Sequence, residues 1–232
     1  MPPLTVPELR SRWKPVKERL LARHPNHPTV VRMHRALSWY QRSEDAPDGQ
    51  DADLVLLCQW IALNSFYGQW DTQRREPQPD WEGCRRFFHR LLRLDASGHI
   101  KAVLIDHRDL AMALLEDQYL SDYFWEDPTD RRASQSRKAR YDARTWYDQE
   151  MWAMLLDRLL ERVYLLRCQL AHGAATYGGK LNRQSLALCT QIMRPLLSAV
   201  LLVITDHGAD EDWGVMCYPP LEEKGRSKSR PY

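Results

Sequence analysis

The sequence has few glycines and lacks the alternation of apolar and polar residues that marks β-strands. Gly occurs 10 times in 232 residues, and apolar residues, 44% of the chain, recur at helical spacing. This spacing excludes a fold built mainly from strands. A chain of this length can also bury one ample core without a covalent staple. We therefore predict an all-α fold.

The sequence also lacks a disulfide framework or a metal-binding pattern. Its five cysteines are odd in number and scattered, with no Cys-x-x-Cys pair. Cysteine and histidine are too dispersed to indicate a zinc site, so we expect no structural metal and no cofactor. The first residues, MPPLTVPELRSRWK, lack the apolar run of a secretory signal. We therefore expect reduced thiols and a cytoplasmic location.

Long apolar runs and a strong excess of one charge are missing as well. The longest uncharged apolar run, Pro195 to Thr205, is far shorter than the ~20 residues of a membrane-spanning helix, so we predict a buried helix and no membrane partner. The net charge is only +2, so affinity for nucleic acid would need local clusters. Two basic clusters, within 131–144 and 224–230, are interpreted either as solvated surface or as ligand contacts.

Apolar periodicity and helix-ending residues divide the chain into helices. We predict them at about 6–23, 29–43, 52–70, 81–94, 100–105, 110–120, 143–172 and 183–207. The last two carry heptad-like seams and are joined by a short loop, which favours an antiparallel helix pair. Residues 1–207 are expected to form a single helical domain, and residues 208–232 an irregular arm and basic tail.

The most informative segment is ERVYLLRCQLAHGAATYGGKLNR, in which Arg167 and His172 stand near the end of an apolar helix. Five residues of regular helix turn ~500°, which would place these side chains ~140° apart unless the helix ends there. Gly173 favours such an ending. Two interpretations stay open: the two cations complement the negative end of the helix dipole, or Arg167 holds a phosphate while His172 moves a proton.

At these residues the sequence resembles the HEPN superfamily, helical proteins marked by an Arg, four to six residues and a His near a helix end. The match is Arg167-Cys168-Gln169-Leu170-Ala171-His172, with GAATYGGKLNR after it and WIALNSFYG at 60–68 before it. It is closest to an uncharacterised bacterial branch, over about 51–70 and 145–220. The resemblance implies an HEPN-like helical bundle, with Arg167 as the phosphate-binding residue and His172 as the general acid or base.

The resemblance also implies a metal-independent endoribonuclease of toxin or antiviral-defence type, with the site built across a two-fold homodimer. RNA or a nucleotide would be the ligand, and a cognate antitoxin or another protein a possible partner. The residue after the Arg is often polar in the superfamily but is Cys168 here. This departure keeps two alternatives open: a non-catalytic module that binds nucleotide, nucleic acid or a partner protein, and a purely structural interaction protein.

Three further residues are assigned to the substrate site. Asn64, among apolar neighbours in the third helix, is predicted to be buried and hydrogen-bonded, because an unpaired buried amide costs ~1 to 3 kcal/mol. Lys180 and Arg183 are expected to add positive charge to a substrate rim formed by the loop 173–182, for which an ordinary interhelical loop is the alternative. Apolar residues off the main seam are expected either to form the dimer surface or to pack within one subunit: Leu155, Leu160 and Tyr164.

Overall fold

The computed structural model describes residues 2–46, 51–121, 130–180 and 182–219, without the side chains of 130–137 and 140. Helices make up 72% of the structure and strands 3%, which confirms the all-α class. The elements in chain order are α1 (Val6–Arg23), α2 (Pro28–Glu44), α3 (Ala52–Tyr67), β1 (Trp70–Asp71), β2 (Glu76–Pro77), α4 (Asp80–Leu94), α5 (His99–Asp106), α6 (Arg108–Glu116), the 3-10 turn η1 (Gln118–Leu120), α8 (Asp130–Asp148), α9 (Trp152–Ala171), α10 (Arg183–Val203) and the π-helical turn η2 (Ile204–Gly208).

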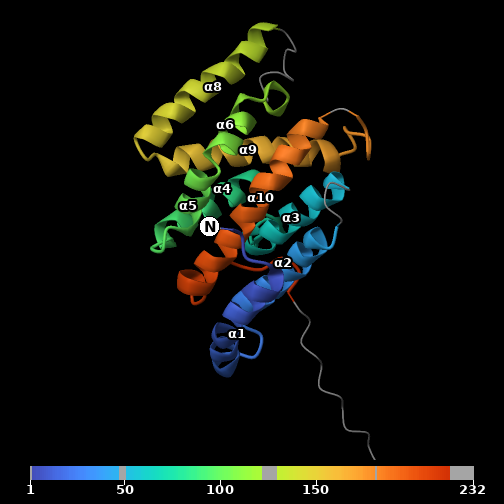
Figure 1. Cartoon of the computed structure of the whole chain (residues 1–232). Helices are drawn as coiled ribbons and strands as arrows, with labels where there is room; N and C mark the ends of the chain where they lie inside the picture. Colours follow the sequence, from blue (N-terminus) through green and yellow to red (C-terminus); the bar gives the residue numbers. More distant parts are fainter. Residues whose placement is uncertain (1, 47–50, 122–129, 181, 220–232) are drawn as a thin grey trace, which may run out of the picture.

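Helix α10 forms the centre of the molecule, with α3 and α5 packed against it (Figure 1). Its second half, from Pro195 to Val203, is buried throughout, as the uncharged run predicts. By length and composition alone, the segment Arg183–Gly208 could cross a membrane, yet 72% of its most apolar window is covered by the rest of the protein. Burial of this kind is the property of a core helix in a globular domain.

The long helix expected at 143–172 is two helices. Helix α8 ends at Asp148 and α9 begins at Trp152, because Glu150 between them adopts a left-handed conformation with φ of 53°. A right-handed helix cannot pass through such a residue. Figure 1 shows α9 crossing α10, so the predicted antiparallel pair is not confirmed. The α9 seam packs on α3, α4 and α6.

The residues proposed for a dimer surface on α9 pack within the chain. Leu155 and Leu160 are both fully buried, with 0% exposure. Tyr164 is half-buried, and its ring centroid lies 5.6 Å from that of Trp60 and 5.2 Å from that of Trp81. The apolar positions beside the main seam are therefore used by neighbouring helices, which surround α9 on more than one side.

Most of the remaining boundaries follow the predictions, but α8 begins at Asp130, well before 143, and the helix expected at 110–120 ends at Glu116 and is followed by the 3-10 turn η1. The predicted helix at 6–23 is confirmed, and the Asp51 side chain caps α3 by accepting a hydrogen bond from the Leu54 amide. Helix α3 ends at Tyr67, not near 70, because Trp70–Asp71 pairs antiparallel with Glu76–Pro77. The loop expected near 125–130 lies almost wholly outside the described residues.

The C-terminal segment from 209 to 218 is irregular, as predicted, but it packs on the helical domain. Trp213 is 5% exposed, and Gln69 and Met216 form an antiparallel bridge. The Arg32 side chain on α2, 1% exposed, joins this segment to the end of α3. Its guanidinium donates to five backbone carbonyl oxygens at 2.8–3.4 Å, those of Ser65, Phe66, Gly68, Trp213 and Gly214. The segment is thereby held beside α3.

Candidate functional site

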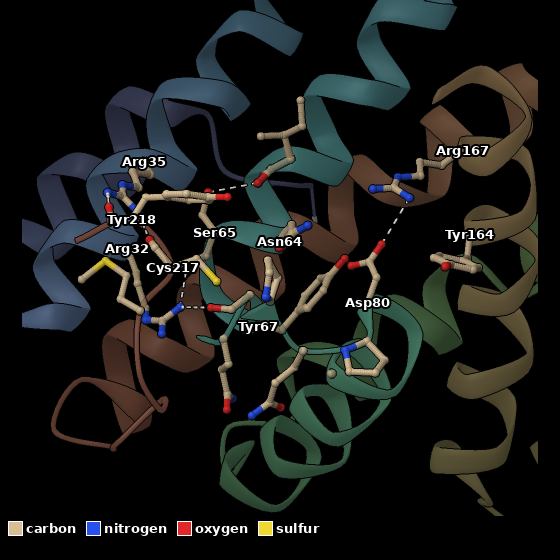
Figure 2. Close-up of a pocket in the computed structure, with 18 of the residues that line it drawn as sticks. Arg32, Arg35, Asn64, Ser65, Tyr67, Asp80, Tyr164, Arg167, Cys217 and Tyr218 are labelled. Carbon is tan, nitrogen blue, oxygen red and sulfur yellow. Dashed lines mark hydrogen bonds and ion pairs between the residues drawn. The ribbon is translucent and has the colours of Figure 1, made fainter. Parts of the chain in front are cut away.

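Arg167 and His172 line the same cleft, together with Asn64. The cleft has a volume of about 560 Å³. It lies between the end of α3, the start of α4, the end of α9 and residues 216–218, and Figure 2 shows the side chains that face it. Segments far apart in the sequence therefore meet around the two residues that the motif singles out.

The way α9 ends explains how two residues five apart can face one cleft. His172 is the first residue past the helix, and its amide still donates to the Cys168 carbonyl at 3.0 Å. Gly173 then turns the chain with φ of 72°, and the Ala174 amide donates to the Gln169 carbonyl at 2.9 Å. This is the glycine-ended helix that the sequence predicts. It leaves His172 exposed at the rim, while Arg167 lies deeper.

The Arg167 guanidinium is held on one side and open on the other. Its Nη1 lies 3.2 Å from Asp80 Oδ2 and 3.8 Å from Cys168 Sγ. Its central carbon lies 5.8 Å from the ring centroids of both Trp60 and Tyr164, within cation–π range. Nη2 and Nε donate to no described residue, and neither atom is buried. This free edge can donate to a phosphate.

The electrostatics of the cleft keep Arg167 charged and Tyr67 neutral. Burial lowers the pKa of Arg167, but Asp80 and Cys168 outweigh that effect and the pKa is raised. Burial also raises the pKa of Tyr67 well above its ordinary value, and Cys84 and Asp80 add to the shift. Tyr67 therefore stays a neutral phenol in the wall of the cleft.

Asp80 is the important residue of this site that the sequence did not reveal. Asp80 is the first residue of α4. The prolines before it and the regularly spaced apolar residues after it indicate only that a helix starts there. Its Oδ2 is buried and, among the described residues, has no hydrogen bond besides the ion pair with Arg167. Figure 2 shows the Tyr67 hydroxyl, also buried and without a hydrogen bond to a described residue, directed towards Asp80.

The cleft carries a positive formal charge. Its charged lining residues are Arg32, Arg35 and Arg167 against Asp80, so three positive charges and one negative charge leave +2. Arg35 donates to the carbonyls of Cys217 and Tyr218 at 3.1 and 2.6 Å and pairs with no carboxylate in the described part of the chain. Figure 2 shows Arg35 and Arg167 on opposite sides of the cleft. Such a cleft favours an anionic ligand.

Asn64 lies at the cleft, but not in the environment predicted for it. It is half-buried instead of buried, and its side-chain amide makes no hydrogen bond to another described residue. The reason is that α3 ends at Tyr67, which places Asn64 in the last turn, at the mouth of the core. A Cβ added at Gly68 would lie 2.6 Å from Asn64 Oδ1 and 2.9 Å from the Asn64 carbonyl oxygen, so a larger residue would require the backbone to shift.

Lys180 and Arg183 do not reach this cleft within one chain. Lys180 is exposed on a separate hollow that it shares with Gln169 and Asn182. The Arg183 guanidinium makes two hydrogen bonds to Asp53, at 2.5 and 2.7 Å, and the Asp53 side chain is 5% exposed. The predicted rim role of Arg183 is therefore replaced by an ion pair that fastens the start of α10 to the start of α3.

Replacing Arg183 with Met should lower the free energy of unfolding by about 1 to 3 kcal/mol, because the buried Asp53 carboxylate loses its ion-pair partner. The loss is limited because the Arg183 side chain is itself partly exposed. The hydrogen bonds from Arg183 hold the pKa of Asp53 below its usual value. The stabilisation is therefore complete above the ordinary carboxyl pKa of about 4 and is lost as the pH falls through the depressed native value.

Urea unfolding at a series of pH values measures this effect. The difference between wild type and Arg183→Met should shrink below pH ~4. Arg86→Met is the matched control, because its partner Glu82 lies 3.6 Å away and both side chains are more than half exposed. An equally small effect of both substitutions at neutral pH would contradict the structural role of Arg183.

Comparisons with protein-family models, with curated proteins and with solved structures found no match to this chain. Among the described residues, no group of three or more His, Cys, Asp or Glu side chains is arranged to hold a metal ion. The geometry of the cleft and the motif that it contains are therefore the features that indicate a function.

Proposed function

We propose that this chain is an HEPN-like, metal-independent endoribonuclease of toxin or antiviral-defence type that acts in the cytoplasm. Its catalytic residues are Arg167 and His172. One observation carries the proposal: a guanidinium with a free edge and an exposed imidazole line a single cleft of formal charge +2. These are the groups that hold a phosphate and move a proton.

The chemistry begins when the 2′-hydroxyl of a ribose attacks the adjacent phosphorus. His172 removes the hydroxyl proton, and Arg167 stabilises the negative charge that builds up on the non-bridging oxygens. The bond from phosphorus to the 5′-oxygen then breaks, and that oxygen takes up a proton. The products are a 2′,3′-cyclic phosphate and a 5′-hydroxyl. One neutral imidazole can accept a proton but has none to give to the leaving oxygen at the same time.

A second copy of the chain would supply the missing proton donor, so we propose a two-fold homodimer in which two Arg167/His172 pairs share the site. Leu155 and Leu160 are unavailable for this contact because they are buried. Exposed apolar side chains at the cleft, Ile61 and Tyr218 with exposures of 38% and 75%, support an interface there instead.

Light scattering on the purified chain should give the mass of a dimer at micromolar concentration. Replacing Ile61 and Tyr218 together with Asp should shift the mass to that of a monomer, because two charges would enter an apolar contact. Val215→Asp, at another exposed apolar residue, is the control. A monomeric wild-type protein would exclude the composite site.

The experiment that tests the proposed activity is incubation of purified protein with mixed RNAs in EDTA. Cleavage that persists in the chelator and is lost in His172→Ala, with the fold intact by circular dichroism, supports a metal-independent enzyme. RNA that stays intact under all conditions rejects it. We also propose a cognate antitoxin or other protein partner, whose identity follows from neither the cleft nor the motif.

A second candidate function is supported by a specific observation. Asp80 already neutralises one edge of Arg167, and Cys168 places a thiol at 3.8 Å where the superfamily often has a polar residue. Both features suit a non-catalytic module that binds a nucleotide, a nucleic acid or a partner protein through the same cleft. RNA binding that depends on Arg167 without any cleavage would favour this alternative.

A further inference from the structure

We infer that Asp80 is a specificity residue of the cleft, which biases it against terminal phosphates and in favour of internal phosphodiesters. The inference rests on the proposed function, in that a phosphate binds at the free edge of Arg167. Asp80 places a negative charge beside this edge, and Asp80 is not part of the motif in the sequence.

The position of Asp80 is fixed relative to Arg167. Asp80 Oδ2 lies 3.2 Å from Nη1, and the central carbon of the guanidinium lies 5.8 Å from the ring centroids of both Trp60 and Tyr164. Aspartate has a short side chain, and here it belongs to the first turn of the 15-residue helix α4. A phosphate on the Nη2 and Nε edge would therefore lie about one guanidinium width from the carboxylate.

Tyr67 is a second, independent indication that Asp80 belongs to a binding site. The Tyr67 side chain is only 2% exposed, and burial and Asp80 together raise the pKa of its phenol. Its hydroxyl is directed towards Asp80 without a hydrogen bond of normal geometry to a described residue. An unpaired buried hydroxyl costs free energy. The hydroxyl is a hydrogen-bond donor beside the Asp80 carboxylate, so it can hold this carboxylate in the wall of the cleft.

The charge of the ligand decides how strongly Asp80 opposes it. A phosphodiester carries one negative charge, whereas a terminal phosphate carries about 1.5 to 2 at pH 7. Arg35 and Arg167 attract both ligands, but the additional charge of the terminal phosphate also meets the repulsion of Asp80. Repulsion between partly exposed charges at this separation corresponds to about tenfold in affinity.

The test uses two ligands that differ in this charge and in one methyl group: 2′-deoxyuridine 3′-monophosphate and its methyl ester, neither of which can be cleaved through a 2′-hydroxyl. Titration calorimetry with the full chain gives both affinities. In Asp80→Asn both ligands should bind more tightly, and the monophosphate should gain about three- to tenfold more than the ester. Asp80→Ser, which is also favoured at a helix start, provides a second neutral variant.

Glu82→Gln is the matched control, because it removes the same charge from the same helical turn and does not line the cleft. It should leave the ratio of the two affinities unchanged. An unchanged ratio in both Asp80 variants overturns the inference, while RNA cleavage in EDTA would still support the proposed function. Failure of both ligands to bind any of the proteins would overturn the phosphate site, and the proposed function with it.

Discussion

In His172→Ala, RNA cleavage should fall by at least about 100-fold, the contribution typical of a positioned acid or base. RNA affinity should change little, because His172 is exposed at the rim and Arg167 remains in place. Single-turnover cleavage and filter binding measure the two quantities separately. If His172 only ended the helix, its replacement would change the cleavage rate little, and that change would follow a change in stability.

Arg167→Lys completes this prediction. Lysine keeps the positive charge beside Asp80 but lacks the planar fork that grips two phosphate oxygens, so both cleavage and affinity should drop. His24→Ala is the matched control for the histidine variant, since His24 is exposed at the end of α1, far from α9 (Figure 1). A loss of cleavage in His24→Ala as large as in His172→Ala would remove the evidence for a specific role.

Replacing Arg32 with Met should destabilise the fold by about 3 to 5 kcal/mol, because a buried cation that satisfies several buried carbonyls is removed. The hydrogen bonds go to the end of α3 and to residues 213 and 214, so their loss should also free the C-terminal segment. Burial lowers the pKa of Arg32 to about 10, and the side chain therefore stays charged at neutral pH.

Urea unfolding measures this effect, and Arg35→Met is its control. Arg35 lies on the same helix but is half-buried and donates to two carbonyls, so its replacement should cost about 1 kcal/mol. Proteolysis of the native protein provides a second readout, since the segment around Trp213 should become cleavable in Arg32→Met. Equal stabilities of the two variants would contradict the role assigned to Arg32.

Local signals in the sequence were sufficient to predict most helices. Asp51 caps α3 and Gly173 ends α9, and both effects depend only on residues within a few positions along the chain. The break at Glu150 could not be predicted, because glutamate has no preference for a positive φ and tertiary packing must impose it. The heptad spacing on α9 shows that the helix is buried but does not identify its neighbours.

Apart from Asn64 on α3, the residues of the cleft that could be predicted belong to one short segment. Arg167 and His172 stand close together in the sequence, and the same helix end brings both to the cleft. Asp80 and Arg35 come from other helices, and nothing near them in the sequence indicates contact with α9. Arg183 looked available because its partner Asp53 lies 130 positions away. The charge of a residue is therefore weak evidence for a ligand contact when its ion-pair partner can lie far away in the sequence.

The most direct test of the proposed cleavage is to identify the ends of the fragments that form in EDTA. Attack by a 2′-hydroxyl assisted by His172 and Arg167 predicts a 2′,3′-cyclic phosphate on one fragment and a 5′-hydroxyl on the other, and it predicts that DNA of the same sequence stays intact. Fragments with 5′-phosphate ends, cleavage of the DNA, or cleavage only after a divalent metal is added would contradict the assignment of Arg167 and His172.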